Sequence, residues 1–358
     1  MKPLSRITER FGESVIREMT RICDAKNGYN LSQGFPDFDI PVELKTAVIE
    51  FINAGYNQYP VTFGEPELRS ALAKKVAKYN GIKANPDTDI TVTCGATEAM
   101  IATLKAIINQ GDEIIIFEPF YENYGPDGIL SGATPRFVTL HYPNWNYDPK
   151  ELALAFNEKT KAIIINTPNN PTGKVFTRAE LEEIALLCHK WDCYAITDEV
   201  YEHILYDNRK HVSLASFSDM ADRTITIGSA SKTFSVTGWR VGWAIAPAQI
   251  SKRIRKVHDF LTVGAPTPMQ QAIAKGLEFP DTYYLDLKNE YEERRTFITQ
   301  VLSSFGFEFS IPQGAYYILC GIEKVKEKIG VKNDFNFSIQ LIEKTKVATV
   351  PGSSFYSN

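Results

Sequence analysis

Residues 228–243 read GSASKTFSVTGWRVGW and follow a short apolar run, Thr224–Ile227, that is typical of a buried strand. Lys232 therefore falls in a turn of small residues directly after a strand end, with Arg240 shortly beyond it. Burial disfavours the charged form of a lysine, so it lowers the pKa and makes the amine nucleophilic. Serine hydroxyls and an arginine are donors that an anionic phosphate needs. The stretch indicates a Schiff-base lysine beside a phosphate site, although a single lysine in such a turn is more often simply solvated.

The bulk composition of the 358-residue chain fits one large globular domain plus a smaller one. Its net charge of −4 and its lack of a basic block argue against a nucleic-acid partner. The polar start, MKPLSRITERFGE, argues against a secretory signal. No apolar run approaches the ~20 residues needed to span a bilayer. The five scattered cysteines lack metal-ligand spacing, so we expect free thiols, a cytoplasmic location and no bound metal.

From about residue 89 onward, strand-like and helical segments alternate. The predicted strands are Ile90–Thr93, Glu113–Phe117, Arg136–Leu140, Ala162–Ile165, Tyr194–Thr197, Thr224–Ile227 and Gly242–Ala246. Thr177 and Glu180 form a capping box at the start of one intervening helix. Apolar strands that alternate with helices favour an α/β fold with a mostly parallel, seven-stranded sheet covered on both faces. No glycine motif of a nucleotide-binding fold follows any of these strands.

The residues that follow the strands are the candidate site, because ligands of such a sheet bind outside the carboxyl ends of its strands. These residues are Gly95, Ala96, Thr97, Tyr121, Asn170, Asp198, Tyr201 and Lys232. The first three open a helix, where free N–H groups favour an anion. Asn170–Pro171 is a candidate for a cis bond. Five loops would thus converge on one crevice.

The two ends of the chain predict further helices and a second, smaller α/β unit. Val15, Ile16, Met19 and Ile22 have the spacing of a leading helix, and Asp281 is placed to cap a long helix that ends near Leu302. The smaller unit would contain strands at Phe307–Ser310 and Ala315–Cys320 and a helix at about Asp334–Thr345. We expect an arm and part of the small domain in residues 1–40, a large domain in 41–282, and the interdomain helix and the rest of the small domain in 283–358.

The 228–243 stretch closely resembles the cofactor-lysine signature of class I/II aminotransferases, the fold type I enzymes that use pyridoxal 5′-phosphate. LSQGFPDF at 31–38 and EPFYENY at 118–124 also match this pattern. These segments look most like the branch that contains kynurenine, glutamine–phenylpyruvate and methionine aminotransferases. The similarity extends from about Asn30 to Ser354.

The resemblance implies a role for each candidate around the cofactor ring. Lys232 would bind the cofactor covalently and then act as general base and acid on the substrate α-proton. Asp198 would keep the ring nitrogen protonated, and Tyr201 and Asn170 would donate to the ring oxygen. Tyr121 would stack on the ring, with Phe120 as the second choice; ordinary core packing is the alternative for both.

The same resemblance implies a phosphate site and a substrate contact. The phosphate would be bound by Gly95, Ala96, Thr97, Ser229, Arg240 and Tyr59 of a neighbouring subunit. Ser231 is a weaker candidate. Gly34 would contact the substrate, together with Tyr121 and Asn170, and the role of Tyr59 requires a homodimer.

The implied reaction moves an amino group from an L-amino acid of methionine, glutamine or aromatic type to a 2-oxo acid by a ping-pong mechanism. The alternative is a cysteine-conjugate or cystathionine-type C–S β-lyase on the same scaffold, because a fold does not fix a reaction. The family also carries an arginine for the substrate carboxylate, after the PGSSF segment at 351–355. We expect that arginine beyond Asn358; the alternative is that another group supplies this affinity.

Overall fold

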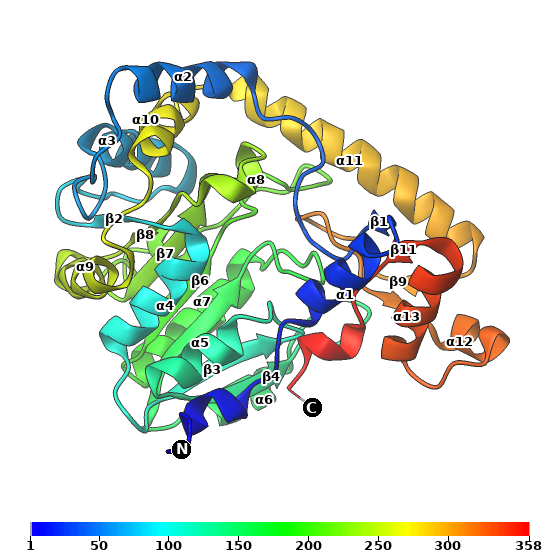
Figure 1. The fold of residues 1–358 in the computed structure, drawn as a ribbon. Coiled ribbons are helices and arrows are strands. Elements are labelled where there is room, and N and C mark those ends of the chain that lie inside the picture. The colour runs from blue at the N-terminus through cyan, green and yellow to red at the C-terminus, as the bar shows by residue number, and fades with distance from the viewer. Residues whose placement is uncertain (1, 358) are drawn as a thin grey trace.

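Seven strands form the central sheet of the computed structural model, which describes residues 2–357 (Figure 1). They are β2 (Ile90–Thr93), β3 (Glu113–Glu118), β4 (Thr134–Thr139), β5 (Thr160–Asn166), β6 (Tyr194–Asp198), β7 (Thr224–Ser229) and β8 (Gly242–Ile245). Their spatial order is β2-β8-β7-β6-β5-β3-β4, and β8 runs antiparallel to both of its neighbours. The other pairs are parallel, so the prediction of a mostly parallel seven-stranded sheet is confirmed.

Helices cover both faces of the sheet because its strands are apolar on both sides. Successive residues of a strand point to opposite faces, so Ile115 and Ile163 pack on one face while Ile114 and Ile164 pack on the other. The first face is covered by α6 (Pro149–Ala155) and α7 (Arg178–Lys190). The second is covered by α4 (Gly95–Ile107), α5 (Tyr124–Ser131) and α9 (Ala248–Thr262). The predicted capping box of Thr177 and Glu180 starts α7.

A third group of helices packs beside β2 and β8. It contains α2 (Val42–Asn53), α3 (Pro66–Lys75), which continues as one π-helical turn at Val76–Asn80, and α10 (Thr267–Gly276). The long helix α11 (Asp281–Ser304) then leads to the C-terminal part of the chain (Figure 1). Asp281 does not cap this helix as predicted, because Pro280 occupies the cap position; its carboxylate instead pairs with Lys78 at 2.5 Å.

The C-terminal part packs against the start of the chain. Strand β1 (Tyr29–Asn30) pairs in parallel with β11 (Val347–Ala348), and β9 (Glu308–Phe309) pairs antiparallel with β10 (Cys320–Gly321). Its helices are α1 (Val15–Asp24), α12 (Glu323–Ile329) and α13 (Asp334–Thr345). Of the predicted strand at Ala315–Cys320, only Cys320 is in a strand, as the first residue of β10. The part before it is irregular: Ala315 has a left-handed φ of 55°, and the hydroxyls of Tyr316 and Tyr317 bond to Gly34 and Tyr201.

Short helical turns complete the description. They are Arg6–Arg10, Leu214–Ser216, Ala230–Thr233 (α8), Thr237–Trp239 and Gly352–Phe355. All five cysteines are free thiols, and Cys94 and Cys320 are only partly buried. Within residues 2–357, no helix combines the length and the apolar character that crossing a bilayer requires.

Candidate active site

Lys232 lies in α8, which begins at the end of β7. Its Nζ donates a hydrogen bond to the carbonyl oxygen of Gly34 at 2.7 Å and lies 5.7 Å from the ring centres of Tyr201 and Tyr316. Burial lowers the pKa of Lys232 to about 8, although Asp198 opposes the shift. The amine therefore loses its proton more easily than an ordinary lysine, as a nucleophile or a general base must.

Asp198 is the last residue of β6 and is buried. Its Oδ2 accepts a hydrogen bond from the hydroxyl of Tyr124 at 2.7 Å, and its Oδ1 accepts one from the N–H of Val200 at 3.3 Å. Burial raises the pKa of Asp198 to about 6, while these two hydrogen bonds and the charge of Lys232 favour the carboxylate. An anionic group thus lies next to the reactive amine at the carboxyl edge of the sheet.

Gly95, Ala96 and Thr97 open α4, where N–H groups have no carbonyl partner within the helix. Gly95 has φ of 81°, and a side chain at this position would overlap the guanidinium group of Arg240. A side chain at Gly242 would collide with the backbone of Gly95 and Ala96. The start of α4 and the turn before β8 therefore form one cationic corner that suits a phosphate.

Ser229 and Ser231 belong to the same corner but already bond to each other. The hydroxyl of Ser229 accepts from the N–H of Ser231 at 3.0 Å and so caps α8; it also lies 2.6 Å from the Ser231 hydroxyl. A bound phosphate would have to share or replace these bonds. Both serines remain candidate phosphate ligands.

Of the two predicted aromatic candidates, Tyr121 faces the site and Phe120 faces the core. Phe120 is buried and stacks on Phe137 with ring centres 5.2 Å apart. Tyr121 is partly buried and meets the ring of Tyr124 edge to face at 5.7 Å. Tyr124 is the residue that donates to Asp198, so the Tyr121 ring lies beside the predicted cofactor groups.

Two tyrosines from the C-terminal part of the chain complete the site. The hydroxyl of Tyr317 lies 2.7 Å from that of Tyr201, and the hydroxyl of Tyr316 donates to the carbonyl oxygen of Gly34 at 3.0 Å. A side chain at Gly34 would overlap the phenol of Tyr317, so this position has room only for glycine. Sequence reasoning missed Tyr124, Tyr316 and Tyr317. The only signal for the last two was their place in a predicted strand.

Asn170 and Tyr59 differ in how closely they join this group. Asn170 is buried after β5, where its N–H donates to Asn166, and the Asn170–Pro171 bond is cis as predicted. Asn166 in turn donates to the backbone carbonyl of Asp198 at 3.0 Å. Tyr59 is 84% exposed on the loop before α3, and within this chain it is not gathered with the other candidates.

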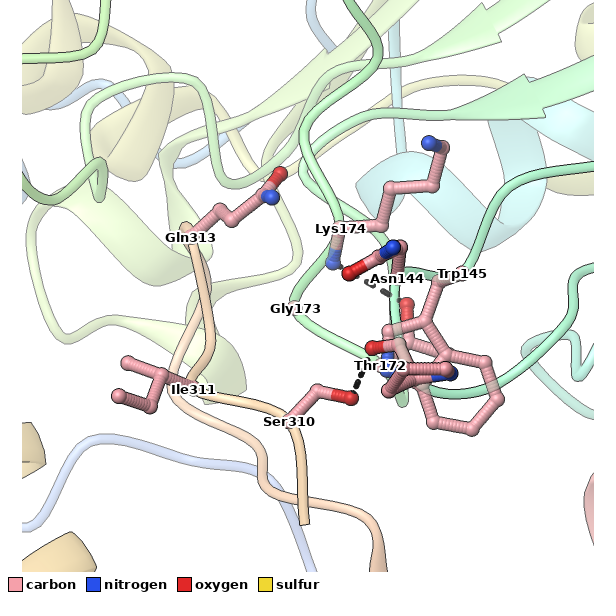
Figure 2. Close-up of a pocket in the computed structure, with 9 residues that line it drawn as sticks. Asn144, Trp145, Thr172, Gly173, Lys174, Ser310, Ile311 and Gln313 are labelled. Carbon is pink, nitrogen blue, oxygen red and sulfur yellow. Dashed lines mark hydrogen bonds between the residues drawn. The ribbon is translucent and has the colours of Figure 1, made fainter.

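The loop after Asn170 also contacts the C-terminal part of the chain (Figure 2). Gln313 accepts a hydrogen bond from the N–H of Val175 at 3.0 Å, and the hydroxyl of Ser310 donates to the carbonyl oxygen of Pro143. A cavity of about 200 Å³ lies between these segments. None of the predicted site residues lines it. The contact connects the two parts of the chain without being the site.

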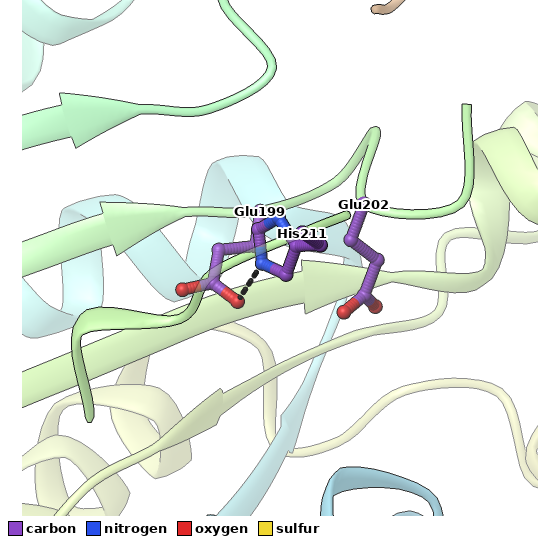
Figure 3. A group of neighbouring side chains, drawn as sticks. All are labelled: Glu199, Glu202 and His211. Atoms are coloured by element: carbon purple, nitrogen blue, oxygen red, sulfur yellow. Dashed lines mark hydrogen bonds and ion pairs between the residues drawn. The ribbon is translucent and has the colours of Figure 1, made fainter. Parts of the chain in front are cut away.

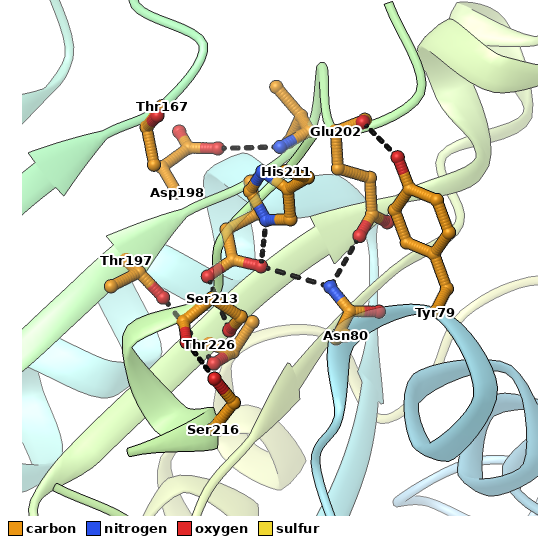
Figure 4. A network of polar contacts seen from close by, with 12 residues as sticks. Tyr79, Asn80, Thr167, Thr197, Asp198, Glu202, His211, Ser213, Ser216 and Thr226 are labelled. Carbon is orange, nitrogen blue, oxygen red and sulfur yellow. Dashed lines mark hydrogen bonds and ion pairs between the residues drawn. The ribbon is translucent and has the colours of Figure 1, made fainter. Parts of the chain in front are cut away.

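A buried ionic network supports the loop that follows Asp198. Glu199, Glu202 and His211 lie together, with His211 Nε2 2.7 Å from Glu199 (Figure 3). Asn80 donates to both carboxylates, at 3.1 Å and 2.6 Å (Figure 4), and Lys75 forms an ion pair with Glu202. Burial opposes ionisation of Glu202, but the charge of Lys75 outweighs it and lowers the pKa of Glu202 to about 2. Lys75 supplies the positive charge that the cluster needs, so the network reads as a structural support.

Comparisons with known proteins agree with this geometry. The sequence profile of the family "Aminotransferase class I and II" matches residues 26–358. Kynurenine–oxoglutarate transaminase 1 of Homo sapiens is 37% identical over 367 residues, which cover 95% of this chain and 87% of that protein. The corresponding protein of Rattus norvegicus is 39% identical over 356 residues, with 92% and 84% covered. The chain belongs to this family.

Solved structures of other aminotransferases have the same fold. An Escherichia coli protein whose structure and reactivity identify a methionine aminotransferase function superposes with a TM-score of 0.94, at 34% identity, covering 100% of this chain and 92% of that one. An aromatic aminotransferase from Pyrococcus horikoshii gives 0.87 at 37% identity, with 95% and 90% covered. The present chain is therefore an aminotransferase of the family that uses pyridoxal 5′-phosphate.

The residues of the aminotransferase fit that cofactor. Its aldehyde needs an amine with a lowered pKa, which Lys232 supplies. Its phosphate needs N–H groups and a cation, which lie together at Gly95 and Arg240. Its ring nitrogen needs a buried carboxylate, and Asp198 is such a group.

Proposed function

We propose that this enzyme transfers the amino group of an L-amino acid of methionine, glutamine or aromatic type to a 2-oxo acid in two half-reactions. The observation that carries the proposal is the pairing of Lys232, whose pKa burial lowers to about 8, with the buried carboxylate of Asp198. Both lie at the edge of the sheet where the parallel strands end. An amine and an anion arranged in this way serve proton transfer at a carbon next to a cofactor ring.

When bound, pyridoxal 5′-phosphate supplies an electron sink for the bonds of the substrate α-carbon. Lys232 would take the α-proton as a free amine and return it as an ammonium group. Asp198 would hold a positive charge on the ring nitrogen. Arg240 and the N–H groups at the start of α4 would bind the phosphate, and Tyr121 would cover the ring and exclude water. Tyr201, whose pKa burial raises well above its ordinary value, would remain a hydrogen-bond donor.

The substrate class follows from the relatives and from the aromatic surroundings of Lys232. The names of the similar proteins include kynurenine, methionine and aromatic substrates. In this chain, Tyr121, Tyr201, Tyr316 and Tyr317 surround the reactive amine and its carboxylate partner. Aromatic walls favour large uncharged or sulfur-containing side chains over small acidic ones.

The proposal is tested by following the visible absorption of the purified holoenzyme while substrates are added in turn. Methionine, glutamine or phenylalanine alone should bleach the cofactor band, and a 2-oxo acid added afterwards should restore it. Aspartate is the control donor and should bleach the band more slowly. Release of pyruvate and ammonia from a cysteine conjugate, without any 2-oxo acid, would instead identify a β-lyase and refute the proposal.

We further propose that the enzyme acts as a homodimer in which Tyr59 reaches the phosphate site of the neighbouring subunit. Its high exposure in the single chain supports this role. Tyr59→Phe should weaken cofactor binding about tenfold or more, because hydrogen bonds to charged groups are the strong ones. Tyr56→Phe is the control, since Tyr56 packs on Phe51 of its own chain. A monomer in sedimentation, or unchanged cofactor affinity in Tyr59→Phe, would contradict the proposal.

A further inference from the structure

Tyr124 is the first residue of α5 and is almost completely buried. Its hydroxyl donates to Asp198 Oδ2 at 2.7 Å, the shorter of the two hydrogen bonds that the carboxylate accepts from Tyr124 and Val200. The ring is held edge to face by Tyr121 at 5.7 Å. Burial, followed by the charge of Asp198, raises the pKa of Tyr124 well above its ordinary value. The phenol therefore stays protonated and donates.

The two carboxylate oxygens of Asp198 have different hydrogen-bond partners. Oδ2 receives a short hydrogen bond from a rigidly packed ring, whereas Oδ1 receives only a longer one, from a backbone N–H. A hydrogen bond to a carboxylate is strengthened by its charge, and it favours the ionised form over the protonated one. Loss of the Tyr124 hydroxyl would leave a buried carboxylate with weaker support.

We propose that Tyr124 is a positioning residue that fixes Asp198 through Oδ2, keeps it anionic and leaves Oδ1, which accepts the long bond from the Val200 N–H, to meet the cofactor; this inference rests on the role proposed for Asp198. The resemblance to aminotransferases did not single out this tyrosine. Its function follows from the contact between α5 and the end of β6. By holding the Asp198 carboxylate in place, Tyr124 would also affect how tightly that carboxylate binds the positively charged cofactor ring.

Other charged and titratable groups also face Asp198 and shift its pKa. Glu199 on the same loop disfavours the carboxylate, and Lys232 from α8 favours it. Tyr121, Tyr201 and Tyr317 surround it and are held neutral by burial. Since the Tyr124 hydrogen bond lowers the pKa of Asp198, its removal raises that pKa. The carboxylate would then be lost at a higher pH than in the parent enzyme.

The test is Tyr124→Phe, which removes the hydroxyl and keeps the ring. We expect cofactor affinity, measured by titrating the cofactor-free protein with pyridoxal 5′-phosphate, to fall about tenfold to a hundredfold. The pH at which the absorption of the bound cofactor changes on the acid side should move upward. Unfolding of the cofactor-free protein, followed by circular dichroism, shows whether the variant is folded.

Tyr147→Phe is the matched control, because the Tyr147 hydroxyl also donates to a carboxylate, that of Glu183 at 2.9 Å, in the core away from the site. It should cost stability without changing cofactor affinity or the pH profile. If Tyr124→Phe does no more than this, the inference is wrong. Asp198→Asn distinguishes a failure of the inference about Tyr124 from a failure of the role proposed for Asp198. If it weakens cofactor binding while Tyr124→Phe does not, only the inference fails; if it binds the cofactor normally, the role proposed for Asp198 fails.

Discussion

Lys232→Ala is expected to abolish transamination, with a loss of at least about a thousandfold. The variant lacks the amine that would bond to the cofactor aldehyde and would carry the α-proton. Within the described residues, no other lysine donates a hydrogen bond to Gly34 or lies over the ring of Tyr201 or Tyr316. Turnover with an amino donor and a 2-oxo acid measures the effect. Borohydride reduction followed by mass spectrometry should label the parent protein at Lys232 and leave the variant unlabelled.

Lys275→Ala serves as the control for the lysine variant. Lys275 lies on α10, where it forms an ion pair with Glu50 at 3.0 Å on the surface. Its replacement should leave both turnover and labelling unchanged. Transamination by Lys232→Ala at a rate near that of the parent, or parent-like labelling at a different lysine, would remove the basis of the proposed site.

Asp198→Asn is expected to lower turnover about a hundredfold to a thousandfold, the usual cost of removing a preorganised charge from an active site. The amide keeps the size of the carboxylate but cannot hold a positive charge on the cofactor ring. The charge of Asp198 also raises the pKa of Lys232. Without that charge, Lys232 should lose its proton at a lower pH than in the parent enzyme. Rate measurements across pH check both effects.

Asp127→Asn is the matched control for the carboxylate. Asp127 lies on α5, and burial raises its pKa to about 7 although Lys105 opposes the shift. It resembles Asp198 in burial and in its raised pKa, but within the described residues no hydrogen bond or ion pair joins it to Lys232 or Tyr201. Its charge also acts on Tyr121 and Tyr124, so its replacement should mainly change stability and lower turnover far less than Asp198→Asn does. If both aspartate variants lowered turnover equally, the special role of Asp198 would be refuted.

Much of the fold could be predicted because its signals are local. Apolar runs and the capping box at Thr177 lie within single elements, so strand and helix positions follow from neighbouring residues. The loops after the strands could be assigned to one site because parallel strands end at one edge. Lys232, Asp198 and Gly95 were found in this way, and the structure brings them together.

The missed residues depend on contacts between distant segments. Tyr317 meets Tyr201 across 116 positions of the sequence, and Glu202 meets Lys75 across 127. No pattern of spacing encodes such pairs. Most of the predicted strand at Ala315–Cys320 is absent for the same reason. The side chains of Tyr316 and Tyr317 both bond to residues of the site, and these tertiary contacts outweigh strand propensity.

The reversed direction of β8 limits where the chain can take insertions. Because β8 starts beside the end of β7, the segment that connects them, with Lys232 near its start and Arg240 near its end, stays at the ligand-binding edge of the sheet. Loops on the opposite edge of the sheet can lengthen without moving either group. A residue inserted between Lys232 and Arg240 would instead displace at least one of the two groups from the site.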